Sequence, residues 1–273
     1  MTTTAEDDDL SLDPWVGHVL GGRYRLVARI GAGGMGVVYR AWDLAADRYV
    51  VVKMPKRELL GEPKFLQRFE QELSALRSLS HTAVVPVVDV GNEQGTPFAV
   101  MPYLAGGSLK QRRLFTQDGQ AAPEPPANLW RWLPAVAQAL DFVHASGYVH
   151  RDVKPDNVLF DGPGKPFLSD FGVAKIVLQA EDETASRGLT GTGMALGTPA
   201  YMPPEQARGD TAAIGPLSDV YALGGVLYHL LTGRPPFLAG SLEAMLKQVF
   251  ESDRKSTRLN SSHEWISRMP SSA

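Results

Sequence analysis

The chain has 273 residues, of which 44% are hydrophobic and 21% charged, a composition typical of a folded globular protein. Its formal net charge is only −3, so we expect no nucleic-acid partner. The absence of cysteine excludes disulfides, thiolate catalysis and cysteine-ligated zinc. No run approaches the ~18 apolar residues of a membrane span, and the acidic N-terminus does not resemble a signal peptide. We therefore predict a cytoplasmic protein with no membrane segment in the visible chain.

Residues 1–22 are polar and acidic, which predicts an N-terminal tail, and the EDDD stretch at 6–9 is expected to be solvated. The following residues, 23–104, alternate in hydrophobicity and predict a five-stranded antiparallel lobe with one helix. The helix is expected at 62–79, where apolar residues recur at helical spacing. The five strands are expected at 23–30, 36–43, 48–54, 83–91 and 96–104.

From residue 105 the pattern becomes mainly helical, so we predict a second lobe over residues 105–252. A proline-rich insert at 122–127 precedes a helical segment at 129–147. Pro134 leaves the start of that helix open, because proline belongs in a first helical turn. Residues 217–233 are apolar nearly all round, which predicts a helix buried at the centre of the core.

Three glycines, Gly31, Gly33 and Gly36, fall between the first two predicted strands. Without side chains, the backbone there can bend sharply and approach a polyphosphate. A dinucleotide-binding fingerprint would follow a strand and open a helix, whereas here a second strand follows. The motif alone leaves a plain structural hairpin as the alternative.

Lys53 ends the apolar run VVVK on the third predicted strand. An ammonium group in that position would point into an interior where only a phosphate or a carboxylate could balance it. Glu72 on the following helix is the natural carboxylate partner. A surface lysine at the end of a strand is the alternative interpretation.

The segment HRDVKPDNVLF places Asp152, Lys154 and Asn157 in a tight loop between a long helix and a short strand, and Asp170 follows within SDFG. The oxygens of Asn157 and Asp170 are hard ligands suited to Mg²⁺. Asp152 then remains to accept a hydroxyl proton and to orient the attacking oxygen. In phosphoryl transfer, the main task of such a carboxylate is to position the attacking oxygen.

In this order the motifs resemble those of eukaryotic-type serine/threonine protein kinases, specifically the Hanks-type branch found in bacteria. The resemblance covers about Arg23 to Phe250. It implies an α+β, bilobal protein-kinase-like fold with a five-stranded N-lobe and a mainly helical C-lobe. The matching residues are Gly31, Gly33, Gly36, Lys53, Glu72, His150, Arg151, Asp152, Asn157, Asp170, Phe171, Gly172 and Glu205.

The resemblance implies ATP as the phosphate donor and Mg²⁺, or Mn²⁺ in its place, as the metal. Lys53 would hold the α- and β-phosphates and Glu72 would brace Lys53, while Asn157 and Asp170 would bind the metal. Asp152 would orient the substrate hydroxyl. The implied ATP-binding residues are Ile30, Gly31, Ala32, Gly33, Gly34, Met35, Gly36, Val38, Lys53, Met101, Pro102, Leu104 and Asn157.

Lys154 resembles the lysine of the serine/threonine class, which contacts the γ-phosphate and the threonine matching Thr198. The expected acceptors are therefore Ser and Thr residues of protein substrates. Met101 falls at the gatekeeper position, so adenine would bond the carbonyl of residue 102 and the N–H of Leu104. Relatives often have Glu at position 102, but Pro102 keeps the carbonyl that this pose uses.

A loop rich in Gly and Thr, at 186–205, is too polar to order itself without added contacts. Thr190 and Thr192 lie where bacterial relatives autophosphorylate, so the resemblance implies a regulatory site. A phosphothreonine there would gain a charge-assisted partner in Arg151. Ordinary loop threonines are the alternative. Phosphorylation of one copy of the chain by another would require self-association.

Asp219 lies in the apolar segment that follows, and a buried carboxylate requires partners. The resemblance implies that it bonds the backbone near His150 and Arg151. Two other histidines, His81 and His144, are interpreted as structural.

The last segment, Asp253–Ala273, back-translates as a common short-read sequencing adapter, interrupted by a gap the size of a sample index. We therefore predict that residues 253–273 are translated adapter and not native protein. The resemblance then implies missing helices, one carrying the arginine that pairs with Glu205, and neither Arg258 nor Arg268 is that residue. We therefore expect this chain to be a weakly active or aggregation-prone fragment of a longer protein. The full-length protein would be anchored in the membrane by a C-terminal segment that this chain lacks.

The two alternatives to a protein kinase are a pseudokinase scaffold and a small-molecule kinase. A pseudokinase scaffold, which binds nucleotide without transferring phosphate, usually lacks an equivalent of Lys53, Asp152 or Asp170, and none is lost here. A small-molecule kinase is disfavoured by residues 197–205, which resemble a platform for peptide substrates. The favoured hypothesis is ATP-dependent phosphorylation of Ser and Thr on proteins, in bacterial signalling.

Overall fold

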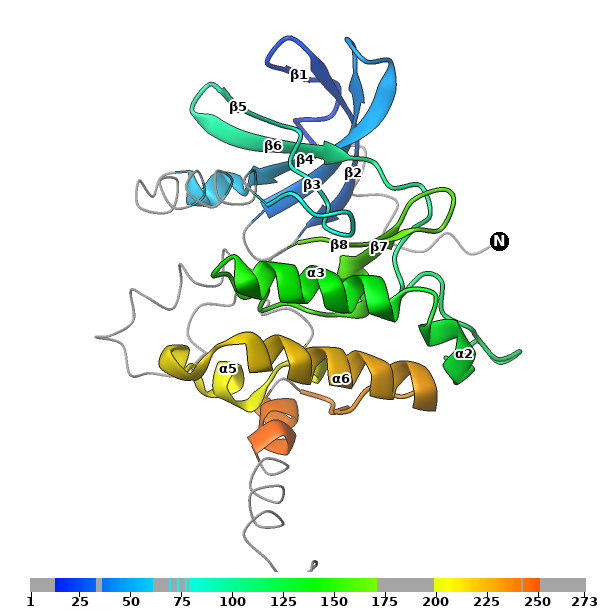
Figure 1. Ribbon diagram of the computed structural model, residues 1–273. Coiled ribbons are helices and arrows are strands. Elements are labelled where there is room, and N and C mark those ends of the chain that lie inside the picture. The colour runs from blue at the N-terminus through cyan, green and yellow to red at the C-terminus, as the bar shows by residue number, and fades with distance from the viewer. Residues whose placement is uncertain are drawn as a thin grey trace, which may run out of the picture.

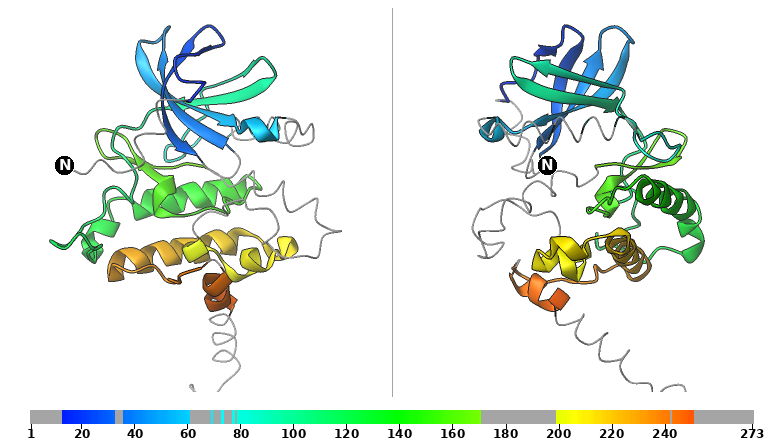
Figure 2. Two further views of the ribbon diagram at one scale, coloured as in Figure 1. Left: turned by 180° about the vertical axis from the view of Figure 1, so that it is seen from behind. Right: turned by 60° about the vertical axis from the view of Figure 1, so that its left-hand side comes forward.

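The computed structural model describes residues 13–32, 36–60, 79–170, 199–241 and 243–250, together with residues 69, 73 and 77. The fold is α+β and has two parts (Figure 1). A sheet forms the upper part, and the helices α3 (Leu133–Ala145) and α6 (Pro216–Thr232) lie one below the other in the lower part. The views from behind and from the side show the same two layers of helix beneath the sheet (Figure 2).

The upper sheet has six strands in the order β1-β2-β3-β4-β6-β5, with antiparallel neighbours throughout. The first three predicted strands are confirmed, because β2, β3 and β4 match them to within two residues. Their alternating side chains bury one face, which forms a cluster around Tyr39, Val52 and Val100. The strands are β1 (Val19–Leu20), β2 (Tyr24–Ala32), β3 (Gly36–Asp43), β4 (Arg48–Pro55), β5 (Asp89–Glu93) and β6 (Thr96–Pro102).

The sheet has one strand more than the five predicted, because β1 belongs to it. Polar contacts hold the segment before β1 against the sheet. The buried hydroxyl of Tyr39 donates to the carboxylate of Asp13, at 3.1 Å from either oxygen, and Arg29 lies 3.6 Å from the same group. Asp13 therefore anchors the segment before β1 to the sheet, which the acidic composition of residues 1–22 did not indicate.

The strand predicted at 83–91 is shorter and later than expected, since β5 begins only at Asp89. Val84 instead makes a parallel bridge to Leu168 in the lower part, and Val85 donates its N–H to the carbonyl of Leu168. Pro86, which lacks an N–H, follows this junction and cannot extend the hydrogen bonding. The segment therefore joins the two parts of the molecule before it enters the sheet.

Most of the helix predicted at 62–79 lies outside the described residues. Of its predicted apolar face, Phe69, Leu73 and Leu79 are described, and all three are buried. Phe69 and Leu73 pack in one cluster with Leu59 and with Ala99 of β6. The helical pattern is therefore confirmed at Phe69 and Leu73, whereas Leu79 lies outside a helix and packs in the cluster of the lower part.

The lower part is built around α3, whose start at Leu133 places Pro134 in the first turn. This settles the point that the sequence left open. Val136, Leu140 and Val143 are buried in one cluster that reaches from α3 to α6 and to a separate two-stranded sheet formed by β7 and β8. The shorter elements are α2 (Pro126–Leu129), η2 (Arg57–Leu59), η3 (Pro155–Asn157), β7 (Val158–Phe160), β8 (Pro166–Leu168), η4 (Pro199–Tyr201), α5 (Pro204–Arg208) and η5 (Thr211–Ala213).

The prediction that α6 is buried all round is wrong for the described structure. Val226 and Leu230 are buried against α3, but Leu217 is 80% exposed, Val220 56% and Tyr228 51%. The residues that the structure describes pack against one face of this helix only. The apolar composition of α6 indicated its burial correctly for that face and not for the other.

No helix among the described residues has both the length and the apolar character needed to cross a membrane. The proposed tail at 253–273 lies outside the described residues, so its assignment as translated adapter stays a prediction.

Candidate active site

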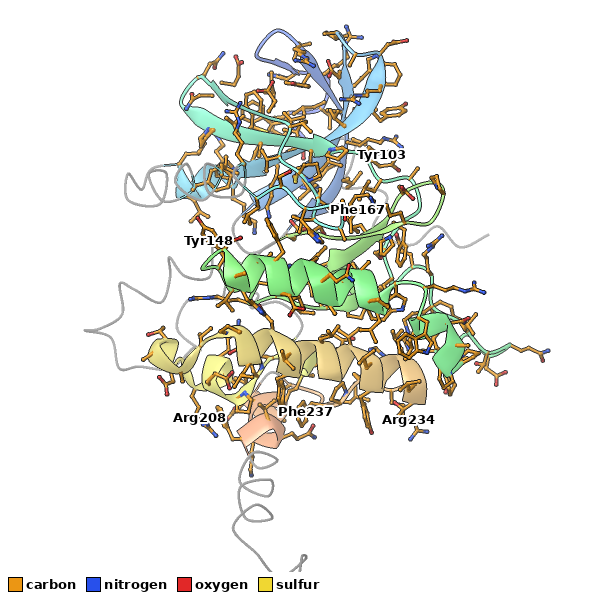
Figure 3. The ribbon with its side chains drawn as sticks, viewed as in Figure 1. Tyr103, Tyr148, Phe167, Arg208, Arg234 and Phe237 are labelled. Atoms are coloured by element: carbon orange, nitrogen blue, oxygen red, sulfur yellow. The ribbon has the colours of Figure 1, made fainter. Side chains whose placement is uncertain are left out.

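The predicted site residues gather between the sheet and the helices, on the inner ends of the strands and on the loop between α3 and β7. Tyr103, which follows β6, lies at the junction of the two parts, and Phe167 of β8 lies close beneath the sheet (Figure 3). The site is therefore assembled from both parts of the molecule.

Residues of the upper part form a row across four strands. Gly31 pairs with Val38, Val38 with Lys53, and Lys53 with Ala99, so these residues of β2, β3, β4 and β6 lie side by side. A Cβ atom on Gly36 would lie 2.8 Å from the carbonyl oxygen of Met54, so glycine is required there for packing. The glycine-rich segment thus joins two strands, as the sequence predicted.

Further predicted nucleotide contacts lie at the inner ends of these strands. Met101 and Pro102 end β6 and pair with Val51 and Val50 of β4, and Leu104 follows. Ile30 of β2 is half exposed. Gly33, Gly34 and Met35 lie outside the described residues.

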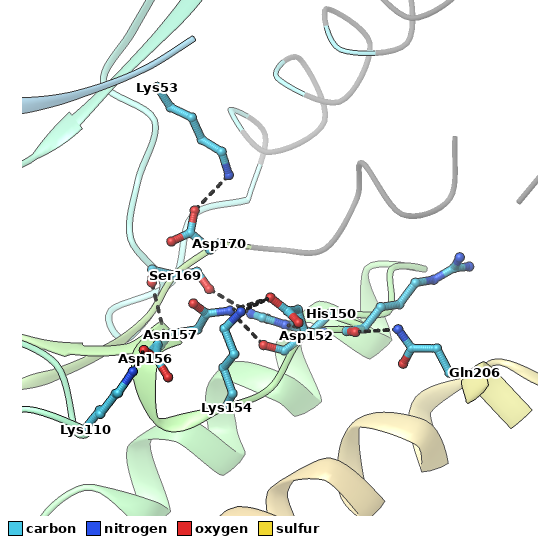
Figure 4. A network of polar contacts seen from close by, with 11 residues as sticks. Lys53, Lys110, His150, Asp152, Lys154, Asp156, Asn157, Ser169, Asp170 and Gln206 are labelled. Atoms are coloured by element: carbon cyan, nitrogen blue, oxygen red, sulfur yellow. Dashed lines mark hydrogen bonds and ion pairs between the residues drawn. The ribbon is translucent and has the colours of Figure 1, made fainter. Parts of the chain in front are cut away.

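Lys53 and Asp170 meet between the two parts. The ammonium nitrogen of Lys53 lies 2.8 Å from Oδ1 of Asp170, which follows β8 (Figure 4). This ammonium group is the main reason that the pKa of Asp170 is lowered, so the carboxyl group is held ionised. Glu72, the predicted carboxylate partner of Lys53, lies outside the described residues, and that pairing stays a prediction.

The loop between α3 and β7 holds Asp152 by its neighbours. Lys154 donates to Oδ2 of Asp152 at 2.7 Å. The side-chain amide of Asn157 donates both to the same oxygen, at 3.0 Å, and to the backbone carbonyl of Asp152, at 2.8 Å. The carboxylate is thereby fixed in place and remains an acceptor, as a group that receives a hydroxyl proton must be.

The donor set of Asn157 and Asp170 fits a divalent cation. The NH₂ group of Asn157 faces Asp152, which leaves its side-chain oxygen as a hard ligand. Ser169 donates its N–H and its hydroxyl to the carbonyl of Asn157, at 2.9 and 3.1 Å, and so brings Asp170 next to this residue. No group of three or more His, Cys, Asp or Glu that could hold a metal was found among the described residues. A cation here would need ligands from a bound molecule as well.

The backbone that leads to Asp152 is unusual. Arg151 has a φ of 63°, a left-handed conformation that is uncommon for a residue other than glycine. Asp219 of α6, which is 1% exposed, accepts the N–H of His150 at 2.8 Å and the N–H of Arg151 at 2.7 Å. This confirms the contact expected for Asp219. It also explains how a buried carboxylate is compensated.

His150 is fully buried, and both of its ring nitrogens have partners. Nδ1 accepts the N–H of Asp152 at 3.2 Å, so Nε2 carries the hydrogen that it donates to the carbonyl of Ser169, 2.9 Å away. Burial lowers the pKa of His150, which keeps the ring neutral. The imidazole therefore links the loop between α3 and β7 to the segment that carries Asp170.

Two polar contacts of this region were not predicted from the sequence. The interpretation of His144 as structural is confirmed, because its Nε2 lies 2.7 Å from Oδ2 of Asp219, a partner that the sequence did not indicate. The buried amide of Gln206, on α5, donates to the carbonyl of Arg151 at 3.0 Å. Neither residue belongs to a motif that the sequence singled out. His81, the other histidine interpreted as structural, stacks on Phe142.

The described part of the 186–205 loop ends at Glu205. Its carboxylate accepts a hydrogen bond from Ser218 at 2.5 Å and forms no ion pair with any described residue. The three threonines named for this loop, Thr190, Thr192 and Thr198, lie outside the described residues, so their roles stay predictions.

The family model described as "Protein kinase domain" matches residues 24–272. The chain belongs to the protein kinase family. Its relatives include the DNA damage-responsive serine/threonine-protein kinase RqkA of Deinococcus radiodurans, 42% identical over 86% of this chain and 34% of the relative. Serine/threonine-protein kinase PknL of Mycobacterium tuberculosis is 39% identical over 88% of this chain and 57% of the relative. The chain thus spans between a third and three fifths of the length of these curated kinases.

Solved structures of kinases have the same fold. "PpkA-294 apo form" has a TM-score of 0.62 at 29% identity and covers 81% of this chain and 79% of that one. A point mutant of the PknI kinase domain of Mycobacterium tuberculosis has a TM-score of 0.61 at 27% identity and covers 89% of this chain and 88% of that one. The bilobal kinase fold predicted from the sequence is therefore confirmed.

Proposed function

We propose that the protein transfers the γ-phosphate of ATP to Ser and Thr hydroxyls of protein substrates. The observation that carries this proposal is the placement of Asp152. Its carboxylate is fixed by Lys154 and Asn157 on one side, while Asp170 meets Lys53 of the sheet nearby (Figure 4). The names of the curated relatives, all serine/threonine-protein kinases, support the same acceptor class.

In this proposal each residue has one task. ATP, bound with Mg²⁺ or Mn²⁺, supplies the phosphoryl group. Lys53 neutralises phosphate charge, and Asn157 and Asp170 offer oxygen ligands to the cation. Asp152 orients the acceptor hydroxyl and takes up its proton, and Lys154 balances charge beside it. Positioning and charge neutralisation supply most of the catalysis in such a reaction.

Regulation by phosphorylation of Thr190 and Thr192 is part of the proposal, and Arg151 supports it. The guanidinium Nε of Arg151 is buried without a hydrogen-bond partner in the part of the chain that the structure describes. Burial also lowers the pKa of Arg151, which means that an added anion would be favourable there. We place the reaction in the cytoplasm, where ATP is available, with one copy of the chain phosphorylating another.

The proposed activity is tested by transfer of labelled phosphate from ATP to a generic protein substrate, with Asp152→Asn as the inactive control. We expect transfer by the wild-type chain, and a loss of at least about 100-fold in Asp152→Asn. Nucleotide binding without transfer in both proteins would instead identify a pseudokinase scaffold. Amino-acid analysis of the labelled product distinguishes Ser and Thr from Tyr.

The regulatory sites are tested by mass spectrometry of the chain after incubation with ATP and Mg²⁺. Phosphate is expected on Thr190 or Thr192. An active enzyme that carries no phosphate on either threonine would refute this part of the proposal, and the proposed kinase activity would stand.

A further inference from the structure

Gln206 lies on α5 and is a buried polar residue outside every motif of the sequence. The residue is 4% exposed, and its side chain points toward the loop that carries Asp152 (Figure 4). The acceptor is a backbone carbonyl, that of Arg151, so the side-chain nitrogen of Gln206 must be the donor, at 3.0 Å. Gln206 also lines a small pocket together with Asp152 and Lys154.

The carbonyl that Gln206 binds belongs to the strained residue next to Asp152. Arg151 adopts a φ of 63°, which costs energy unless its surroundings hold it. The N–H of Arg151 is held by Asp219, and the N–H of Asp152 by His150. Gln206 holds the carbonyl between these two N–H groups. The peptide that sets the direction of Asp152 is thus bound on its oxygen side and its nitrogen side.

We propose that Gln206 is a positioning residue for Asp152: the hydrogen bond from its amide to the carbonyl of Arg151 holds the loop in the conformation that aims the carboxylate at the acceptor hydroxyl. The inference rests on the proposed kinase activity, and it adds a contact from outside the catalytic loop. Since α5 begins at Pro204, at the end of the 186–205 segment, the same contact links the end of that segment to Asp152.

The chemistry of the donor gives a sharp test. Methionine has about the length of glutamine but cannot donate a hydrogen bond, so Gln206→Met removes the contact with little change in shape. An ionised glutamate presents two acceptor oxygens to the carbonyl and repels it. A protonated glutamate carries one O–H that can donate as the amide does. Gln206→Glu should therefore regain function as the pH falls.

Steady-state phosphate transfer by the full chain is measured for the wild type, Gln206→Met and Gln206→Glu from about pH 5.5 to about pH 8.5. We expect Gln206→Met to lower kcat about tenfold with KM for ATP unchanged. The activity of Gln206→Glu relative to wild type should rise toward acid pH. The rise is measured per folded protein, because a glutamate that only destabilised the fold would regain activity through a larger folded fraction. Wild-type kcat in Gln206→Met, or a flat ratio for Gln206→Glu, overturns the proposal.

A second measurement keeps this test separate from that of the kinase activity. Hydrogen exchange at the amides of Arg151 and Asp152 is compared between the wild type and Gln206→Met. Faster exchange at these two amides, with α3 and α6 unchanged, is expected if Gln206 holds the loop. Unchanged exchange contradicts the inference even if the chain transfers no phosphate. Absence of transfer together with faster exchange counts against the proposed function alone.

Discussion

The loop that carries Asp152 and the Lys53–Asp170 pair are held in different ways. Around Asp152 the contacts come from within the lower part of the molecule: from the loop itself, from α5 and from α6. Lys53 and Asp170, in contrast, come from different parts, and their ion pair joins the sheet to the segment after β8. The surroundings of Asp152 are therefore organised by local packing. The Lys53–Asp170 pair depends on how the two parts are placed.

This difference also appears in exposure. Asp219, which binds the loop backbone, has 1% of its side chain exposed, whereas Lys53 and Asp170 have 31% and 42% exposed. Ion pairs that water reaches contribute little to stability, whereas removing a buried carboxylate that accepts several hydrogen bonds is costly. Substitutions in the two regions should therefore separate stability from activity.

The largest effect is expected for Asp219→Ala. This change leaves the N–H groups of His150 and Arg151 buried without their acceptor and removes the partner of His144. We expect the free energy of unfolding to fall by about 3–5 kcal/mol, and phosphate transfer to be lost with it. Denaturant unfolding measures the first quantity. Asp219→Asn keeps one acceptor oxygen, so its free energy of unfolding should lie between those of the wild type and Asp219→Ala. Equal stability of Asp219→Ala and wild type would contradict the role given to this residue.

The second effect separates activity from folding. Lys53→Met removes the ammonium group that meets Asp170 and that would neutralise phosphate charge. Because this pair is partly exposed, the free energy of unfolding should change by less than about 1 kcal/mol. Phosphate transfer should nevertheless fall by at least about 100-fold. Both are measured on the same preparation, and a strongly destabilised Lys53→Met would show that the pair is structural.

The smallest effect, on the pH dependence of stability, concerns His229 of α6. The polar contacts of this residue lie within the lower part. Arg113 can only donate, so Nε2 of His229 accepts its hydrogen bond, at 2.6 Å, and Nδ1 carries the hydrogen that faces the hydroxyl of Tyr201. Burial, and then the charge of Arg113, lower the pKa of His229 from 6.5 to about 4. The folded state thus binds this proton less readily than the unfolded state does.

Stability should therefore decrease as the pH falls from about 6.5 to about 4 and be independent of this group above that window. His229→Gln offers an acceptor to Arg113 and does not titrate, so its decrease over the window should be smaller. Thermal unfolding of both proteins between these pH values measures the difference. Parallel curves for His229→Gln and wild type would show that His229 is not held neutral in the fold.

Much of the fold and the chemical residues of the site could be predicted, because both have a local signature. Strand alternation located β2, β3 and β4, and the spacing of Asp152, Lys154 and Asn157 placed them in one loop. The contacts of His144 and Gln206 could not be predicted, because each joins residues far apart in the sequence and has no periodicity of its own. Likewise, the apolar composition of α6 does not say which of its faces is covered.

The row from Gly31 to Ala99 across four strands has a consequence for how the sheet must form. Side chains on a strand alternate between faces, so a shift of β4 by one residue would turn Lys53 away from Asp170 and expose the apolar face of the strand. Burial of the apolar face and placement of Lys53 opposite Asp170 thus select the same alignment. A chain with β4 in the wrong register would expose apolar surface and misplace Lys53 at the same time. Correct packing of the core therefore also ensures correct placement of this residue.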